Sequence, residues 1–261
     1  MPKPAGKPAA RVSDLLAQSL GTPGLWALIP ACFIAGTVYG FAGFGAALVF
    51  MPVAAIFLPL ETAIASFNLA ALASVVTVLP GALRDIDRKA SALLIACALP
   101  AVVLGLEILR RADVTALRWG VVAVVSVTLI ALVTGWRYRG TPGPGTRAGV
   151  AAATGLVGGA TGLLGPVLIL FQLAGQDSMR RTRATMLVFL TVTSALLLPL
   201  MALKGVLTAS AIPLGFAMLL PYAAGTKLGQ ALFDPAREEG FRALAYLIIF
   251  AAILLGLPVW D

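Results

Sequence analysis

Histidine is absent from the 261-residue chain, and charged residues make up only 11% of it. Without histidine there is no Ser-His or Cys-His hydrolytic centre, no two-histidine zinc helix and no histidine-ligated haem. The two cysteines, Cys32 and Cys97, lie in separate apolar segments and fit neither a disulfide framework nor a metal spacing. We therefore expect a protein that is not an enzyme and that has no cofactor or metal site.

Charge is scarce because most of the chain is apolar. Hydrophobic residues account for 60% of the sequence, and the mean hydropathy is +0.98. The charged positions bound segments without charge at 15–60, 62–83, 90–106, 119–136, 148–176, 184–203, 205–226 and 243–260. A membrane helix needs about 17 to 25 apolar residues, so 15–60 and 148–176 are too long for one crossing and the others fit one each. The composition indicates a multi-pass, all-α protein in a lipid bilayer.

The chain repeats itself at an offset of 119 residues. A three-glycine spacing, a small-residue step and a proline recur in the same order: Gly36, Gly40 and Gly43 match Gly155, Gly159 and Gly162, Ala65-Ser66 matches Ala184-Thr185, and Pro80 matches Pro199. Internal symmetry of this kind is typical of transporters. We interpret the chain as an amino-terminal arm (1–24), a membrane repeat (25–135), a linker (136–147) and a second membrane repeat (148–261). Each repeat is predicted to be a glycine-broken or re-entrant helical element followed by three transmembrane helices.

The long first element of each repeat decides the symmetry between the repeats. If it crosses once, the repeats are parallel; if it enters and returns on the same side, they are inverted. Lys and Arg gather in cytoplasmic loops. The inverted arrangement, with the amino terminus outside, places most of the 19 basic residues inside, whereas the parallel one divides them almost evenly. We prefer the inverted arrangement, which leaves Arg110, Arg111 and Arg118 outside.

Because the basic residues lie in short groups between apolar segments, we expect no nucleic-acid partner.

Glycine-rich stretches at 36–45 and 155–166 lie inside the two over-long segments. Each interior glycine costs a helix about 1 kcal/mol relative to alanine, and a proline about 3, so the helices should break there. Broken backbone at membrane depth persists only where it is buried in protein or lines an aqueous cavity. The N–H groups that open the following half-helix favour an anion, so two such breaks predict an anion site near the midplane. The alternative is that the glycines only let helices approach closely.

The candidate substrate-binding residues are the glycines of the two breaks and the polar residues near them: Gly40, Gly43, Gly45, Ser66, Asn68, Gly159, Thr161, Gly162, Gly165, Gln172 and Thr185. A lone Ser or Thr in a membrane helix often bonds its own backbone, whereas Asn68 and Gln172 are costlier to bury and are better candidates for a polar ligand. Glu61 and Glu107 are candidates for carrying a coupling proton, with anchoring at the membrane interface as the alternative.

The duplicated glycine segments, followed by Ala65-Ser66 or Ala184-Thr185 and then by Pro80 or Pro199, resemble the TauE/SafE family of bacterial membrane permeases. The resemblance covers roughly residues 25–257, and the second repeat departs from the usual glycine cluster at Leu163-Leu164. It implies a multi-pass protein of the bacterial inner membrane that transports small sulfur-containing anions, such as sulfite, sulfoacetate and taurine-derived organosulfonates, usually as export.

We therefore expect a secondary transporter of such anions that works by alternating access around a midplane site between broken helices. A coupling proton or other ion, and a homodimer, are compatible with the sequence. One alternative is a passive anion channel with the same broken helices, and another is an uptake permease for a different small carboxylate or inorganic anion. A membrane-embedded enzyme or assembly subunit is a further alternative, although the chain offers no obvious general base.

Overall fold

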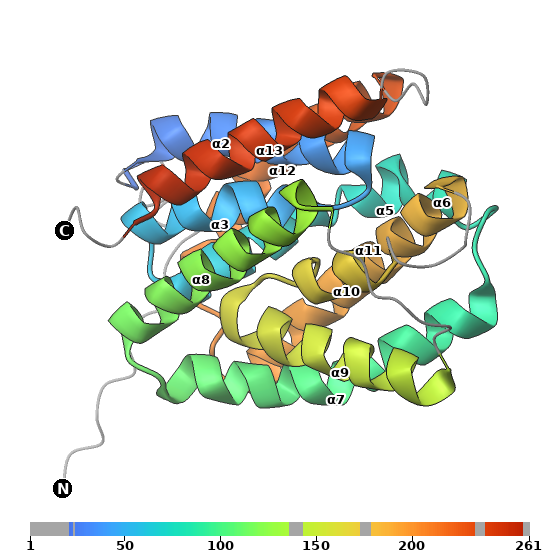
Figure 1. Ribbon diagram of the computed structural model, residues 1–261. Helices are drawn as coiled ribbons and strands as arrows, with labels where there is room; N and C mark the ends of the chain where they lie inside the picture. The colour runs from blue at the N-terminus through green and yellow to red at the C-terminus, as the bar shows by residue number, and fades with distance from the viewer. Residues whose placement is uncertain (1–20, 23, 136–142, 173–178, 233–237, 258–261) are drawn as a thin grey trace, which may run out of the picture.

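The structure is a computed structural model that describes residues 21–22, 24–135, 143–172, 179–232 and 238–257. Within these ranges the chain forms helices and no strand, which confirms the all-α prediction (Figure 1). The helices are α2 (Leu25–Ala42), α3 (Ala46–Phe57), α4 (Leu60–Ala71), α5 (Ser74–Thr77), α6 (Leu79–Ala82), α7 (Arg88–Arg111), α8 (Val114–Val133), α9 (Pro144–Thr161), α10 (Pro166–Gln172), α11 (Met179–Leu203), α12 (Ala211–Ala231) and α13 (Glu238–Leu255). The predicted arm lies almost entirely outside the described residues, as does most of the predicted linker.

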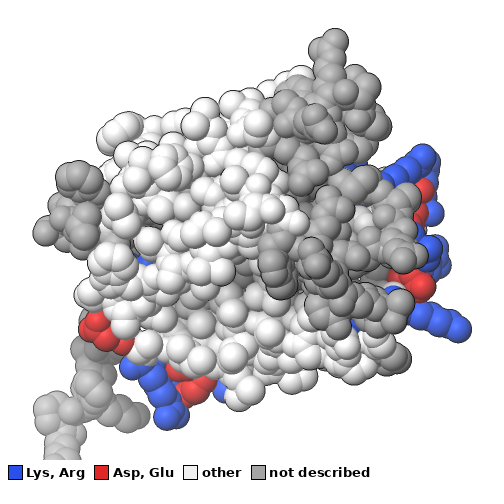
Figure 2. All heavy atoms as spheres, viewed as in Figure 1, with Lys and Arg blue, Asp and Glu red and all other residues white. Residues whose placement is uncertain are grey.

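Six helical segments of the described chain are long and apolar enough to cross a membrane: Leu25–Ala42, Leu60–Thr77, Arg88–Arg111, Val114–Val133, Arg180–Leu203 and Ala211–Ala231. Charged side chains gather at the two ends of the molecule, and an uncharged band lies between them in this view (Figure 2). Length, hydropathy and charge distribution thus agree on a multi-pass membrane protein.

One predicted crossing is interrupted. The sequence predicts a single helix over 62–83, but the structure divides this stretch among α4, α5 and α6. After Ala71 the backbone bonds contract to an i to i−3 pattern, with N···O distances of 3.2 Å at Leu72 and Ala73. Pro80, which has no N–H to donate, lies in the first turn of α6. The second interruption falls at Val78, a β-branched residue with φ of −113° between α5 and α6, directly before the turn that contains Pro80.

Two pairs of helices turn back on themselves, and we call α2–α3 the first hairpin and α9–α10 the second hairpin. In the first hairpin the end of α3 returns to the start of α2, where the rings of Trp26 and Phe57 lie 6.4 Å apart. In Figure 1 the first hairpin enters the bundle from the left and the second from the right. The turns contain Gly43, Gly45 and Gly162 with φ of +81°, +92° and +77°, a conformation that glycine adopts without steric cost.

The first hairpin packs against α12, a helix from the other half of the chain. A Cβ atom added to Gly36 would lie 2.6 Å from the carbonyl oxygen of Tyr222, and one added to Gly40 would lie 2.2 Å from that of Thr226. In return, a Cβ on Gly229 of α12 would lie 2.1 Å from the carbonyl oxygen of Thr37. Any larger residue at these positions would force the two helices apart.

The second hairpin packs against α7 in the same manner. Added Cβ atoms on Gly155 and Gly159 would lie 2.2 Å from the carbonyl oxygen of Ala98 and 2.3 Å from that of Val102. A Cβ on Gly105 of α7 would lie 2.3 Å from the carbonyl oxygen of Leu156. Close helix packing, the alternative considered for the glycine spacing, therefore describes the structural role of Gly40 and Gly159.

We expect Gly159→Ala to destabilise the protein by about 1–3 kcal/mol, because the new methyl group overpacks the contact with α7. Gly120→Ala in α8 is the matched control: an added Cβ there meets nothing within 4 Å, and alanine is favoured over glycine in a helix by about 1 kcal/mol. Denaturant titration in detergent, followed by circular dichroism, measures both variants. Equal free energies of unfolding for Gly159→Ala and Gly120→Ala would contradict the tight contact between Gly159 and α7.

Candidate functional site

A small cavity lies where the turns of the two hairpins meet. Its volume is about 40 Å³, which suits on the order of three water molecules or one small oxyanion. It is lined by Tyr39, Gly45, Ala46, Ala47, Leu48, Phe67, Ala71, Ser74, Gly162, Leu164, Gly165, Pro166, Leu190, Thr191, Ser194 and Tyr222. None of these is charged, so the described part of the chain offers a ligand in this cavity only neutral groups.

Buried hydroxyl groups supply the side-chain polarity of the cavity. The Tyr39 hydroxyl donates to the carbonyl oxygen of Leu187 at 3.1 Å and lies 3.0 Å from Thr191 Oγ1. Tyr222, fully buried, stands beside it with the two ring centroids 6.3 Å apart. Ser74 is likewise buried at the cavity wall. These hydroxyls can rotate to donate to an anion, since each carries one proton and two lone pairs.

The first turn of α3 adds backbone polarity. Gly45 is the N-cap of this helix, and Ala46, Ala47 and Leu48 follow it along the cavity wall. The first N–H groups of a helix have no carbonyl one turn back, and the helix dipole makes this end positive. Only hydrogen or methyl side chains stand at 45–47, so the backbone can approach a ligand closely.

Arg183, near the start of α11, binds the other side of the first hairpin turn. Its Nε donates to the carbonyl oxygen of Phe41 at 2.9 Å, and its second guanidinium nitrogen donates to that of Gly40. These carbonyls lie in the last turn of α2, where the helix supplies no i+4 N–H donor. The stem of Arg183 lies directly over Gly43, where an added Cβ would come within 2.7 Å of its Cγ. A half-buried cation therefore caps the break without lining the cavity.

Three of the predicted binding residues, Gly45, Gly162 and Gly165, line the cavity. Gly40, in the last turn of α2, faces Thr226, and Gly43, in the hairpin turn, faces Arg183. Of the predicted cradle, the start of α3 and the turn before α10 border the cavity, while the preceding glycines pack against other helices.

The predicted polar residues mostly bond their own helices. Ser66 Oγ donates to the carbonyl oxygen of Ala63 at 3.2 Å, Asn68 Nδ2 to that of Ile64 at 2.7 Å, and Thr161 Oγ1 to that of Val157 at 2.7 Å. Asn68 Oδ1 is buried without a partner among the described residues. Thr185 is buried in α11, and Gln172 is half-buried at the end of α10. None of these five residues lines the cavity, and their binding roles stay predictions.

Sequence reasoning missed Tyr39, Ser74, Tyr222 and Arg183. Tyr39 lies inside the first glycine segment, and Arg183 directly precedes the Ala184-Thr185 step, so position along the predicted repeat is the available signal. Neither composition nor residue spacing indicates that Arg183 contacts the end of α2.

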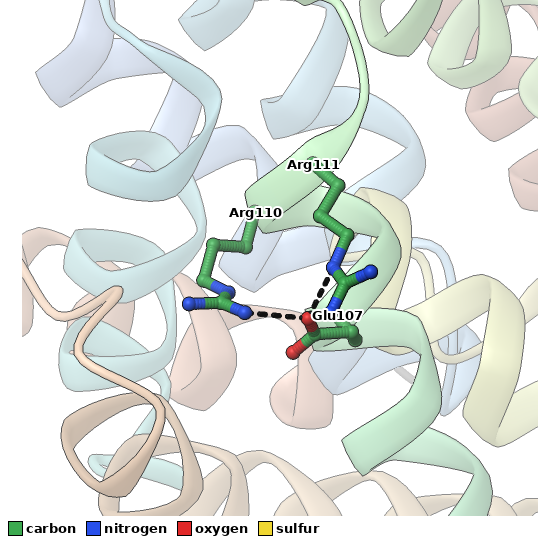
Figure 3. Close-up of polar contacts among 3 residues, drawn as sticks. All are labelled: Glu107, Arg110 and Arg111. Atoms are coloured by element: carbon green, nitrogen blue, oxygen red, sulfur yellow. Dashed lines mark hydrogen bonds and ion pairs between the residues drawn. The ribbon is translucent and has the colours of Figure 1, made fainter.

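The two candidate proton carriers lie outside the cavity. Glu107, in the last turn of α7, accepts hydrogen bonds from Arg110 at 2.6 Å and from Arg111 at 2.5 Å (Figure 3). This cluster gives Arg110 and Arg111, two of the three arginines that the inverted arrangement leaves outside, a carboxylate partner on their own helix. Glu61 lies in the first turn of α4, where a negative charge favours the positive helix end.

Ion pairs join the two halves of the chain at the opposite end of the molecule. Arg180 Nε lies 2.9 Å from Asp85 Oδ2, and Arg181 lies 3.6 Å from Asp87 Oδ2. Asp87 also caps α7, and the hydrogen bond from the N–H of Ala90 is the main reason that the pKa of its carboxyl group is lowered. The loop before α7 and the start of α11 are thereby held together.

The fold defines a multi-pass membrane protein with an uncharged cavity between two hairpins. Residues 28–255 match the family described as "Sulfite exporter TauE/SafE", and the chain belongs to this family. Membership implies membrane transport of sulfite-like or organosulfonate-like anions and agrees with a function other than catalysis. Comparisons with curated proteins and with solved structures gave no match.

We expect Glu107→Gln to leave the pH dependence of anion transport unchanged, because Glu107 is held by two arginines and does not line the cavity. Initial rates of sulfite flux into proteoliposomes, measured across neutral pH, test this. Glu61→Gln, the other candidate, serves as the comparison. A pH profile displaced only in Glu107→Gln would restore Glu107 as a proton carrier.

Proposed function

We propose that the protein is a secondary transporter that exports small sulfur-containing anions, such as sulfite, sulfoacetate or related organosulfonates, through the cavity between the two hairpins. The observation that carries this proposal is the cavity itself, where the first turn of α3 and several hydroxyl groups converge. Its size favours a compact anion such as sulfite over a long organosulfonate.

Neutral donors suit the transport of an anion. A desolvated oxyanion is stabilised by N–H and O–H groups, and a helix N-terminus contributes on the order of 0.3–1 kcal/mol for a nearby negative charge. A transport site must also release its ligand, so binding has to be favourable but weak enough to reverse. A cavity with several hydroxyl and N–H donors and no charged side chain meets both requirements.

We further propose that the two halves are inverted repeats. At the offset of 119 residues, Ala46 corresponds to Gly165, Ala47 to Pro166, and Ala71 to Leu190, and all six residues line the cavity. The hairpins enter from opposite ends of the bundle (Figure 1). Each also packs on a helix from the other half, α2 on α12 and α9 on α7. These features support a cavity on an axis that relates the two repeats.

Alternating access would then expose the cavity to one side at a time. The ion pairs Arg180–Asp85 and Arg181–Asp87 join the halves at one end of the molecule. In this proposal they close that end and separate when the cavity opens towards it. Exposed ion pairs contribute little to stability, about 0–1 kcal/mol each, so they can break within a transport cycle.

Cavity filling tests the site. Ala47→Leu should reduce sulfite transport at least about tenfold, because three added carbon atoms occupy most of a cavity of this size. Ala123→Leu, at an exposed position of α8, is the matched control and should transport like wild type. Flux of radiolabelled sulfite into proteoliposomes measures both.

Three outcomes of this experiment separate the hypotheses. Unchanged transport by folded Ala47→Leu would place the route elsewhere. Flux that fails to saturate and exceeds transporter turnover by orders of magnitude would favour a channel. Transport of a carboxylate or another inorganic anion in place of sulfite would support the permease alternative.

Cysteine labelling tests the inverted arrangement. In a background with Cys32→Ala and Cys97→Ala, Lys89→Cys and Lys204→Cys should react with a membrane-impermeant maleimide from opposite sides of the membrane. Parallel repeats would place both positions on the same side. Labelling in intact cells and in inverted vesicles gives the two measurements, and equal labelling of both positions in one preparation would contradict the inversion.

A further inference from the structure

Arg183 breaks the symmetry between the two hairpin turns. At the offset of 119 residues, Gly43 corresponds to Gly162, and Arg183 corresponds to Ile64. The structure places both pairs in contact: an added Cβ on Gly43 would lie 2.7 Å from Arg183 Cγ, and one on Gly162 would lie 2.9 Å from Ile64 Cγ1. The same position of each repeat thus contacts a hairpin turn: the cation Arg183 contacts the first turn, and the apolar side chain of Ile64 contacts the second.

The cation acts on the helix end whose charge opposes anion binding. The first hairpin turn brings the carbonyl end of α2 and the N–H end of α3 within a few residues of each other. The carbonyl end carries partial negative charge and the N–H end partial positive charge, so their fields oppose each other in the turn. Arg183 binds the carbonyl oxygens of Gly40 and Phe41 and so offsets the negative end.

We propose that Arg183 is a positioning residue for the anion: by neutralising the carbonyl end of α2, it leaves the N–H end of α3 as the dominant charge at the cavity. This inference rests on the proposed function. It makes the first hairpin the side of the cavity that attracts the anion. The second hairpin, where Ile64 replaces the arginine, provides shape and apolar contact.

Two substitutions separate charge from hydrogen bonding. Arg183→Gln keeps N–H donors for the carbonyl oxygens but loses the charge, whereas Arg183→Lys keeps the charge but loses the planar fork. Arg88→Gln is the matched control, since Arg88 begins α7, is exposed and lies outside the cavity lining. Sodium sulfite is the probe, with its Kd measured by titration calorimetry on the full chain in detergent and its KM measured in proteoliposomes.

We expect Arg183→Gln to raise the Kd and KM for sulfite about fivefold, with the maximal rate changed by less than about twofold. Arg183→Lys should stay within about twofold of wild type, because the field of a unit charge is retained. Arg88→Gln should bind as wild type does. Thermal unfolding midpoints of the same samples report any effect on folding.

Wild-type affinity in Arg183→Gln would overturn the inference and leave the proposed function intact. Equal weakening in Arg183→Gln and Arg183→Lys, accompanied by equally lowered unfolding midpoints, would also overturn it, because a cap with a purely structural role predicts that result. Failure of the wild-type protein to bind or transport sulfite would instead overturn the proposed function itself.

Discussion

Backbone groups that leave a helix inside a membrane must find partners within the protein, and the structure around both hairpins depends on this requirement. At each turn one glycine N–H closes the helix: Gly43 donates to the carbonyl oxygen of Tyr39, and Gly162 to that of Gly158, both at 2.8 Å. In the first turn Arg183 satisfies two further carbonyl oxygens. The groups left at the start of α3 border the cavity, where a ligand or water can bond them.

The same constraint explains why the hairpins pack so closely on α7 and α12. Lipid is as apolar as a leucine side chain, so helices in a bilayer associate by close packing and not by hydrophobic burial. Glycines on both partners let backbones meet, at Gly40 and Gly229 on one side and at Gly159 and Gly105 on the other. Each hairpin is thereby tied to the half of the chain to which it does not belong, which couples the two halves across the cavity.

In the proposed transport role, an uncharged cavity with the cation Arg183 behind its wall both attracts an anion and allows its release. A full charge in a low-dielectric site interacts strongly with an anion and would slow its departure. Arg183 donates to the backbone carbonyls of Gly40 and Phe41, and in the proposed role its effect reaches the cavity through the balance of two helix ends. Because the Tyr39 hydroxyl donates to the carbonyl oxygen of Leu187, Thr191 is the donor in its bond to Tyr39, and Thr191 can redirect this proton to a ligand.

The sequence by itself determined the membrane class, the positions of most crossings and the family, because these depend on composition and local pattern, and it drew attention to the two glycine-rich segments. It also identified Gly45, Gly162 and Gly165, which line the cavity. Only the tertiary structure decided that Gly40 and Gly159 contact neighbouring helices, that Ser66 and Asn68 bond their own backbone, and that Arg183 reaches the end of α2. The physical reason is the distance along the sequence over which each interaction acts. A helix break depends on the residues at the break, whereas the partner of a freed carbonyl comes from whichever helix packs beside it.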